Sequence, residues 1–388
     1  MRALAVAGER ALTGSFDGAA ILWSATDGAA RQVLRFHAGG VNAVAFVPGG
    51  FATGGEDGRV ALWRPGETAP WSQAQAHAAP VAQLALSPDG TRLASAGWDG
   101  AARVLDLATG AETRLEHGAP VNGVAFLDDG RLATVAQDLA LRIWPADGGA
   151  PLRVGADAPL NALAAAAGVI AAGGADGTLR LYDARGVALA QVATAGGPIV
   201  GLALSADGRV AAASSVTGAV TLIDVPARAA TREIDEIGPV WSVAFAPDGA
   251  TLLAGGGDRV VRRWDVATGD AVGRTELTTP DPLAGLGDSR GAQVFRACAA
   301  CHTLGPDDEG RAGPSLHGIF GRRIATAPGY DYSPALRAMD IVWTPETVSA
   351  LFEVGPMAYT PGAKMPEQRI GAPEDRAALM AFLAERTR

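Results

Sequence analysis

The stretch from residue 37 to residue 63, HAGGVNAVAFVPGGFATGGEDGRVALW, contains the pattern that decides the fold. Three short runs, residues 41–46, 51–55 and 59–63, have the period-2 alternation of β-strands. The turns between them are rich in glycine, and Asp57-Gly58 is a pair that adopts the positive φ angles of short hairpins. The stretch therefore predicts a small antiparallel sheet in which each strand has two different faces.

This unit recurs along the first 277 residues. Each copy ends in a Trp or in a residue that takes its place: Trp23, Trp63, Leu105, Trp144, Tyr182, Ile223 and Trp264. The copies are 38 to 42 residues apart, which is the period of β-propeller blades. The repeats therefore predict an all-β domain of seven blades over residues 1–277.

The repeats resemble the WD-repeat β-propeller family. The resemblance rests on the turns SPDG at residues 87–90 and APDG at residues 246–249, and on the pair Trp264-Asp265. It covers the chain from residue 1 to about residue 277 and implies a seven-bladed propeller.

Three histidines, His37, His77 and His117, occupy one position in successive copies. In the family, such a histidine contacts the turn aspartate and is linked through Ser or Thr to the closing Trp. The expected networks are His37–Asp57–Thr53–Trp63, His117–Asp138–Thr134–Trp144, and an incomplete His77–Asp99–Ser95 that ends in Leu105. We therefore interpret these histidines as structural, rather than as a metal or second haem site. The later copies lack the histidine, and we expect packing to hold them.

The family binds partners through the face where its turns meet the central channel. By resemblance, the residues that point there precede a turn aspartate or stand early in an innermost strand: Phe16, Glu56, Trp98, Gln137, Asn42, Asn122, Asn161 and Trp241. Exposed Trp residues are common at binding hot spots. We expect a candidate docking site for a protein partner on this face, with packing against neighbouring turns as the alternative for Trp98 and Trp241.

The repeat pattern ends in residues 278–287, where dense Pro and Gly mark a domain boundary. The remaining residues, 288–388, change to a helical period. Ser289 is a candidate N-cap for a first helix, and Phe382 and Leu383 belong to the apolar face of a last one. We expect a linker followed by a second, all-α domain.

The second domain begins with RACAACH, residues 296–302, which holds the chain's only two cysteines, Cys298 and Cys301. A Cys-x-x-Cys-His run is the attachment signature of c-type haem. Cysteines three residues apart on one helical turn face the same way and can bond both vinyl groups of one porphyrin, and His302 then reaches the iron. A redox dithiol remains the alternative for the motif alone, although the βαβ setting of such dithiols is missing, as are the further ligands of a zinc site.

The whole region from Gly291 to Arg388 resembles class I cytochromes c of the mitochondrial and related bacterial type. Further motifs follow in the family's order: GPSLHG at 313–318, FGR at 320–322, APGY at 327–330, Trp343, and PGAKM at 361–365. The resemblance implies one covalently attached haem c. It also implies that the first and last helices cross with Phe382 against Gly291.

The resemblance assigns the iron ligands. Cys298 and Cys301 carry the haem, His302 is the proximal ligand, and the Pro314 carbonyl accepts the other ring N–H of His302. The distal ligand is Met365, whose neutral thioether favours ferrous iron. The rivals are Met339, Met357 and Met380, of which Met357 is the weak alternative, but Met365 sits in the proline-glycine loop.

Further haem contacts also come from the resemblance. Arg322, Tyr332 and Trp343 resemble the residues that hold a buried haem propionate. Leu351 and Ala363 stand where many relatives have a tyrosine and a threonine, so two polar contacts on the distal side are missing.

Composition limits the partners. The net charge of -9 argues against nucleic acid and against an anionic membrane surface. No apolar run of about 18 residues is present, so we expect no transmembrane helix. From Asp288 onward the chain has 11 basic and 12 acidic residues, and the lysine ring with which mitochondrial relatives dock is missing. We therefore expect docking that depends weakly on salt.

The N-terminus carries no export signal, because residues 1–18 lack a charged segment followed by an apolar one. The first copy also begins directly at its innermost strand. By resemblance, haem attachment in bacteria follows export. We therefore expect translation to start upstream and the mature protein to be periplasmic.

Two axial ligands leave the iron no open site for a substrate, which favours one-electron transfer over catalysis. The sequence therefore predicts an electron carrier rather than an enzyme, with a propeller that docks it to a redox partner protein or places it in an assembly. One alternative is an enzyme whose propeller carries a second cofactor, as in nitrite reductases that join cytochrome c to an eight-bladed haem-d1 propeller. The other is a redox-responsive scaffold.

Overall fold

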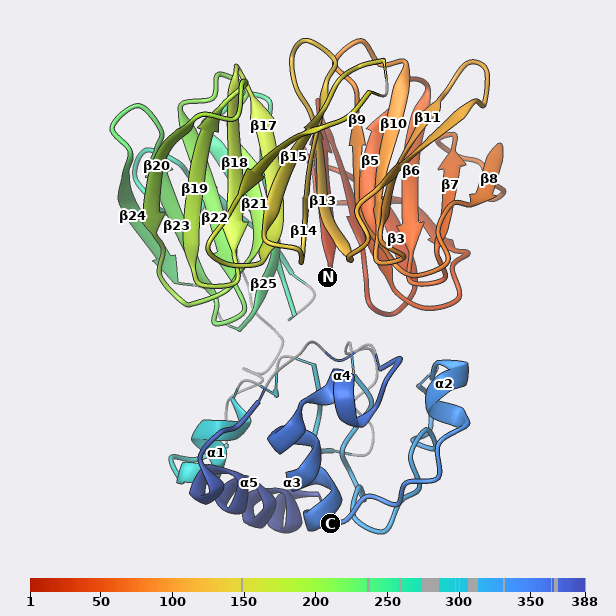
Figure 1. The fold of residues 1–388 in the computed structure, drawn as a ribbon, viewed down its shortest axis with the longest axis vertical. Helices are drawn as coiled ribbons and strands as arrows, with labels where there is room; N and C mark the ends of the chain where they lie inside the picture. The colour runs from red at the N-terminus through yellow and green to blue at the C-terminus, as the bar shows by residue number, and fades with distance from the viewer. Residues whose placement is uncertain are drawn as a thin grey trace. The chain divides into compact units, whose positions relative to one another are not determined.

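The computed structural model divides the chain into two compact units, Met1–Thr278 and Thr279–Arg388 (Figure 1). The structure describes residues 1–147, 149–235, 238–257, 260–273, 286–296, 298–299, 301–305, 313–330, 332–363, 365 and 369–387. Most of the expected linker, residues 278–285, therefore lies outside the described residues.

The first unit consists of seven antiparallel sheets in chain order. The first sheet contains β1 (Ala3–Ala7), β2 (Arg10–Gly14), β3 (Ala19–Ser24) and β4 (Ala30–Arg35). The second contains β5 (Val41–Val47), β6 (Gly50–Gly55), β7 (Arg59–Trp63) and β8 (Ser72–Gln75). The third contains β9 (Val81–Leu86), β10 (Arg92–Gly97), β11 (Ala101–Asp106) and β12 (Glu112–Glu116).

The other sheets repeat this arrangement. The fourth contains β13 (Val121–Phe126), β14 (Leu132–Ala136), β15 (Ala140–Trp144) and β16 (Leu152–Gly155). The fifth contains β17 (Leu160–Ala166), β18 (Val169–Gly174), β19 (Thr178–Asp183) and β20 (Ala188–Ala193). The sixth contains β21 (Ile199–Leu204), β22 (Val210–Ser215), β23 (Ala219–Asp224) and β24 (Ala229–Asp235). The seventh contains β25 (Val240–Phe245), β26 (Thr251–Gly256) and β27 (Val261–Asp265) among the described residues. The seven-bladed all-β propeller expected from the repeats is confirmed.

The core of the propeller lies between neighbouring sheets. Trp63 and Phe51 of the second sheet are each 1% exposed and pack with Leu12 of the first. Similar apolar clusters join each following pair of sheets up to the seventh. At the ring closure, the ammonium group of Met1 donates a hydrogen bond to the Gly256 carbonyl at 2.8 Å. The inner strands thus bury their apolar faces against the neighbouring blades, whereas outer strands such as β8 are exposed.

The innermost strands of six blades share a β-bulge. In the second blade, Val41 pairs with Gly55 and Ala43 with Gly54, so the ladder skips Asn42. The residues skipped in the other five blades are Ala82, Asn122, Asn161, Val200 and Trp241. A bulge redirects the side chain of its extra residue. Four positions expected on the docking face, Asn42, Asn122, Asn161 and Trp241, therefore lie at bulges, where the backbone departs from regular strand geometry.

The histidine network of the second blade is as expected. His37 contacts Asp57 Oδ1 through Nδ1 at 3.0 Å and Thr53 Oγ1 through Nε2 at 2.8 Å. The indole of Trp63 donates to the same Thr53 oxygen at 3.0 Å. In the third blade, His77 contacts Asp99 at 2.9 Å and Ser95 at 2.8 Å, and Leu105 leaves the network without its Trp. Nδ1–H donates to a carboxylate in both blades.

The network of the fourth blade differs from the expected one. His117 Nε2 and the Trp144 indole both contact Thr134 Oγ1 at 2.8 Å. His117 Nδ1, however, faces the Arg142 guanidinium rather than Asp138, and the prediction of a His117–Asp138 contact is wrong. Arg142 pairs with Asp138 instead, at 2.5 Å. Because a guanidinium has only donors, His117 Nδ1 must accept here, and the ring is neutral with its proton on Nε2.

The fifth blade replaces the histidine by an ion pair between a buried arginine and a partly exposed aspartate. The Arg180 guanidinium donates to both carboxylate oxygens of Asp176, at 3.1 and 2.7 Å, and Arg180 is 2% exposed. These hydrogen bonds lower the Asp176 pKa to about 2. The expectation that the later blades are held mainly by packing did not include this pair. The sequence signal for such a pair is the spacing Asp-x-x-x-Arg, which is present in both the fourth and the fifth blades.

The second unit is helical. Its helices are α1 (Arg290–Phe295), α2 (Pro334–Arg337), α3 (Pro345–Val354), α4 (Pro356–Tyr359) and α5 (Pro373–Arg386). The Ser289 side chain caps α1, as expected, by accepting from the Ala292 N–H. None of the helices in the described part of the chain is both long and apolar enough to cross a bilayer.

Helices α1 and α5 cross at a glycine. A Cβ atom on Gly291 would lie 2.2 Å from the Ala378 carbonyl oxygen and 2.6 Å from Phe382 Cβ, so only glycine allows this approach. The rings of Phe295 and Phe382 stack beside it with centroids 5.3 Å apart. The expected packing of Phe382 against Gly291 is confirmed. It fixes the end of α1, from which the cysteine motif continues.

We predict that the propeller loses stability as the pH falls from 6.5 to about 4. Burial and the Arg142 charge lower the His117 pKa from 6.5 to about 4. Between these values the unfolded chain binds a proton that the folded chain does not, so the free energy of unfolding decreases, by at most ~3 kcal/mol. Urea denaturation of the full chain, followed by tryptophan fluorescence at several pH values, measures this change.

The matched variant is His117→Gln, which keeps a hydrogen-bonding side chain without a titrating ring. Its free energy of unfolding should depend less steeply on pH over the same interval. If the free energy of unfolding depended equally on pH in the wild type and in His117→Gln, the assignment of this dependence to His117 would be contradicted.

Candidate functional site

The cysteine motif continues from α1 as a series of turns. The Cys298 N–H donates to the Phe295 carbonyl at 2.8 Å, and the amides of Cys301 and His302 donate to the Cys298 carbonyl at 3.0 and 2.9 Å. Cys298 is 6% exposed, Cys301 is half-buried, and neither is in a disulfide. Burial raises the pKa of the Cys298 thiol to about 12. A raised pKa disfavours Cys298 as the nucleophilic thiolate of a redox dithiol.

His302 is oriented by a backbone carbonyl. Its Nδ1–H donates to the Pro314 carbonyl oxygen at 2.8 Å, the contact expected from the sequence. The ring also lies against Gly313, where a Cβ atom would stand 2.4 Å from His302 Cε1. Since Nδ1 carries the proton, Nε2 is the ring nitrogen that can bind a metal.

The loop that carries Pro314 is tied to the cysteine motif. The Gly313 N–H donates to the Cys301 carbonyl at 2.7 Å, and the Leu316 N–H donates to the Thr303 carbonyl at 2.8 Å. The Ser315 hydroxyl donates to the Gly305 carbonyl at 2.7 Å. Together with the His302 contact, these bonds join residues 301–305 to residues 313–316.

The structure brings Arg322 and Trp343 together. The backbone N–H of Trp343 donates to the Arg322 carbonyl at 2.9 Å. The Arg322 guanidinium donates to the carbonyls of His317 and Ser315, both at 2.8 Å. Arg322 has no carboxylate partner among the described residues, and burial lowers the pKa of its guanidinium. A half-buried cation bonded to neutral carbonyls alone is stabilised by an anion. Burial also raises the pKa of Tyr332, which therefore remains a neutral hydrogen-bond donor.

Met365 borders the same apolar core as Cys298. It is half-buried and packs against that cluster, next to a loop in which Gly362 has a φ of 86°. The Ser333 hydroxyl donates to the Gly362 carbonyl at 2.9 Å and so ties this loop to α2. The rival Met380 lies within the cluster, on α5, and is 8% exposed. The role of Met365 as distal ligand stays a prediction.

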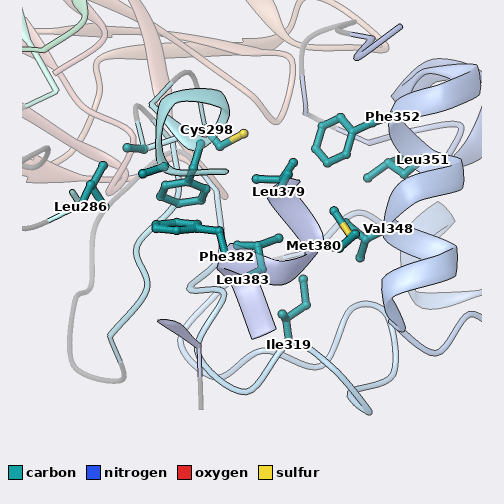
Figure 2. Close-up of a cluster of buried hydrophobic side chains, with 13 residues drawn as sticks. Leu286, Cys298, Ile319, Val348, Leu351, Phe352, Leu379, Met380, Phe382 and Leu383 are labelled. Atoms are coloured by element: carbon teal, nitrogen blue, oxygen red, sulfur yellow. The ribbon is translucent and has the colours of Figure 1, made fainter. Parts of the chain in front are cut away.

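These residues fit a haem group. Figure 2 shows side chains of α3 and α5 gathered in the cluster into which the sulfur of Cys298 points, among them Phe352, Leu379 and Met380. Cys298 belongs to this apolar cluster and Met365 packs against it, while Cys301 and the oriented His302 imidazole follow Cys298 in the same turns. That set matches the vinyl groups, the iron and the apolar faces of a porphyrin, and Arg322 matches a propionate.

The turns of the propeller hold the other candidate site. Trp98 is 40% exposed, and its indole donates to Asn122 Oδ1 at 3.1 Å. Trp241 is 9% exposed instead, because it packs edge-on against Phe16 at 5.6 Å and under the Arg2 guanidinium at 5.8 Å. Of the two Trp residues, Trp98 is therefore exposed for binding and Trp241 is a packing residue.

The other residues expected on this face lie around one end of the channel. Asn42, Asn122, Asn161 and Trp241 line a cavity of about 410 Å³ that runs along the innermost strands. Glu56 accepts a hydrogen bond from the Gly40 N–H at 3.1 Å, and the Gln137 N–H donates to the Pro120 carbonyl at 3.1 Å. Glu56 and Gln137 are thus tied to the residues that precede the innermost strands β5 and β13.

The fold and the site define a class: a β-propeller of WD repeats joined to a small helical domain that carries a Cys-x-x-Cys-His motif. A family model described as "WD domain, G-beta repeat" matches residues 28–64, 71–106 and 234–265. A second model, "Cytochrome c", matches residues 289–387.

Relatives agree with this assignment. The chain is 39% identical over 103 residues to cytochrome c of Cannabis sativa. This match spans 26% of this chain and 92% of the relative. The chain is 39% identical over 104 residues to cytochrome c of Arabidopsis thaliana, with the same coverage. Cytochrome c of Cochliobolus lunatus is 38% identical over 104 residues, covering 26% of this chain and 95% of the relative. Through its C-terminal domain, the chain belongs to the cytochrome c family, which supports haem c as its cofactor and electron transport as its role.

The contacts of two residues, Ser315 and Arg142, were not predicted from the sequence. Ser315 stands next to Pro314 and carries a side-chain bond that no motif indicated. Arg142 displaces Asp138 from His117, and only its spacing from that aspartate could have shown it.

We predict that Gly313→Ala displaces the His302 ring. The new methyl group would overlap the ring, and such overpacking costs ~1–3 kcal/mol of stability. Thermal unfolding and the optical spectrum of the haem-loaded protein measure the two effects. Gly371→Ala is the control, because its Cβ atom would meet no atom within 4 Å. Equal unfolding temperatures for the two variants would contradict the prediction.

Proposed function

We propose that this protein is an electron carrier with one haem, bound through thioethers to Cys298 and Cys301 and ligated by His302 and Met365. The observation that carries the proposal is the bond from His302 Nδ1 to the Pro314 carbonyl, 2.8 Å long, beside the cysteine motif. That bond prepares Nε2 for iron. Membership of the cytochrome c family supports the same group.

The haem supplies a metal that takes up and gives back one electron. The protein residues set how readily it does so. The Pro314 carbonyl makes the His302 ring a stronger donor, and the neutral thioether of Met365 favours the ferrous state. The apolar cluster of α3 and α5 excludes water from both states. Arg322, with Tyr332 and Trp343, would hold a propionate.

A role in electron transfer rather than catalysis follows from the ligand set. His302 and Met365 would together hold the haem iron and would leave it no ligand position for a substrate. In the propeller, His37, His77 and His117 are each bonded within their own blades. These bonds support a structural role for the histidines and a propeller that does not use them to bind a second cofactor.

The propeller would dock or place the carrier. Its turns bring Trp98, held by Asn122, to the channel mouth, and an exposed, oriented Trp is a frequent anchor in protein interfaces. The partner would be a redox protein. We propose a periplasmic location, on the expectation that haem attachment in bacteria follows export, and cell fractionation tests that location.

We predict that Met365→Ala keeps its covalent haem and loses the methionine-to-iron charge-transfer band. The reduction potential should fall, because a harder ligand replaces the thioether. Optical spectroscopy and a redox titration measure both changes. Met380→Leu is the matched control, since it exchanges a buried Met of the same cluster for an apolar residue of similar volume. Loss of the band in Met380→Leu, but not in Met365→Ala, would assign the ligand to Met380.

We predict that Cys298→Ala and Cys301→Ala each weaken or prevent covalent attachment. Each change removes one of the two thioethers. Haem staining on a denaturing gel measures the bound fraction, and Met365→Ala, which keeps both cysteines, is the control. Full staining of the double variant Cys298→Ala/Cys301→Ala would show that these cysteines do not carry the haem.

A further inference from the structure

Ser315 belongs to the same peptide group as the carbonyl that orients His302. A peptide bond is planar, so the Pro314 carbonyl and the Ser315 amide share one plane. The direction of that carbonyl therefore depends on how Ser315 is held. Its oxygen lies 2.8 Å from His302 Nδ1, and a small rotation of the plane would lengthen or bend this bond.

The Ser315 side chain is held on two sides. Its hydroxyl donates to the Gly305 carbonyl at 2.7 Å and accepts from the His317 N–H at 3.1 Å. Gly305 belongs to the segment that follows His302, whereas His317 lies further along the loop. The hydroxyl thus bridges the two segments that the histidine contact also joins.

The Ser315 carbonyl is held as well. Arg322 donates to it at 2.8 Å and, through its other terminal nitrogen, to the His317 carbonyl at 2.8 Å. These bonds restrain the peptide group that follows Ser315. The hydroxyl restrains the residue itself, and with it the preceding peptide group.

We propose that Ser315 is a positioning residue for the axial histidine. Its hydroxyl keeps the Pro314–Ser315 peptide plane in the orientation in which the carbonyl accepts the His302 proton. The inference rests on the proposed function, because it concerns the ligand strength of His302 toward haem iron. A carbonyl in good alignment draws the Nδ1 proton and strengthens the donor nitrogen, which stabilises ferric iron.

The test compares three variants of the full, haem-loaded chain. Ser315→Ala removes the hydroxyl, and Ser315→Thr retains it. Thr326→Val is the matched control, because the Thr326 hydroxyl also donates to a carbonyl, that of Arg323 at 2.6 Å, in an exposed turn. The readouts are the midpoint potential and the rate of solvent exchange of the His302 Nδ1 proton by NMR.

For Ser315→Ala, we expect a higher midpoint potential and a roughly fivefold faster exchange of the ring proton, the factor set by the net strength of one hydrogen bond. Ser315→Thr should restore both values toward wild type, and Thr326→Val should leave both unchanged. A general loss of stability would also speed the exchange, because the ring proton exchanges when the fold opens, but it would not raise the midpoint potential, so the inference requires both readouts to change together.

An unchanged potential and exchange rate in Ser315→Ala, with haem bound and histidine-ligated, would overturn the inference alone. Equal changes in Ser315→Ala and Thr326→Val would overturn it too, since the effect would not be specific to this peptide plane. A wild-type protein without haem, or with an axial ligand other than His302, would instead refute the proposed function.

Discussion

The hydrogen bond from the His302 ring to the Pro314 carbonyl is the constraint around which the C-terminal domain is arranged. It requires the loop of residues 313–318 to lie against the cysteine motif, and Gly313 permits that approach because it has no Cβ. The Gly318 N–H then bonds the Thr387 carbonyl at 2.5 Å, which joins this loop to the end of α5. Helix α5 in turn crosses α1 at Gly291. The histidine, the cysteines and the two terminal helices therefore depend on one another.

In the propeller, blades two to five each provide a side-chain partner for the aspartate of the turn before the third strand, whereas the sixth blade has Thr217 at that position. In blades two and three the partner of the aspartate is a histidine. In the fourth blade Arg142 pairs with Asp138, and in the fifth Arg180 pairs with Asp176. In each of these blades at least one oxygen of the turn aspartate is paired with a nitrogen of a histidine or arginine side chain. They differ in charge, and hence in their response to pH. The blades are thus alike in fold but not in electrostatics.

Much of this could be predicted from the sequence. The repeat period gave the number of blades, and ordered motifs gave the second domain, because strand alternation and ligand spacing are local properties. The partner of His117 could not be predicted, since Asp138 and Arg142 compete for one buried position and the outcome depends on side-chain geometry. Trp98 and Trp241 occupy different positions in the repeat unit. Packing against Phe16 buries Trp241, whereas Trp98 remains exposed. The role of Ser315 depends on a contact with Gly305, ten residues away, that no motif encodes.

The central claim is that this chain carries a single haem, covalently bound to its cysteine motif, for electron transfer. The most direct measurement is the intact mass of the denatured chain, produced in a host with haem-attachment machinery, together with a haem assay per chain. The account predicts a mass increase of one haem and a one-to-one stoichiometry. An unmodified mass, or a second haem or foreign cofactor retained by the propeller, would contradict it.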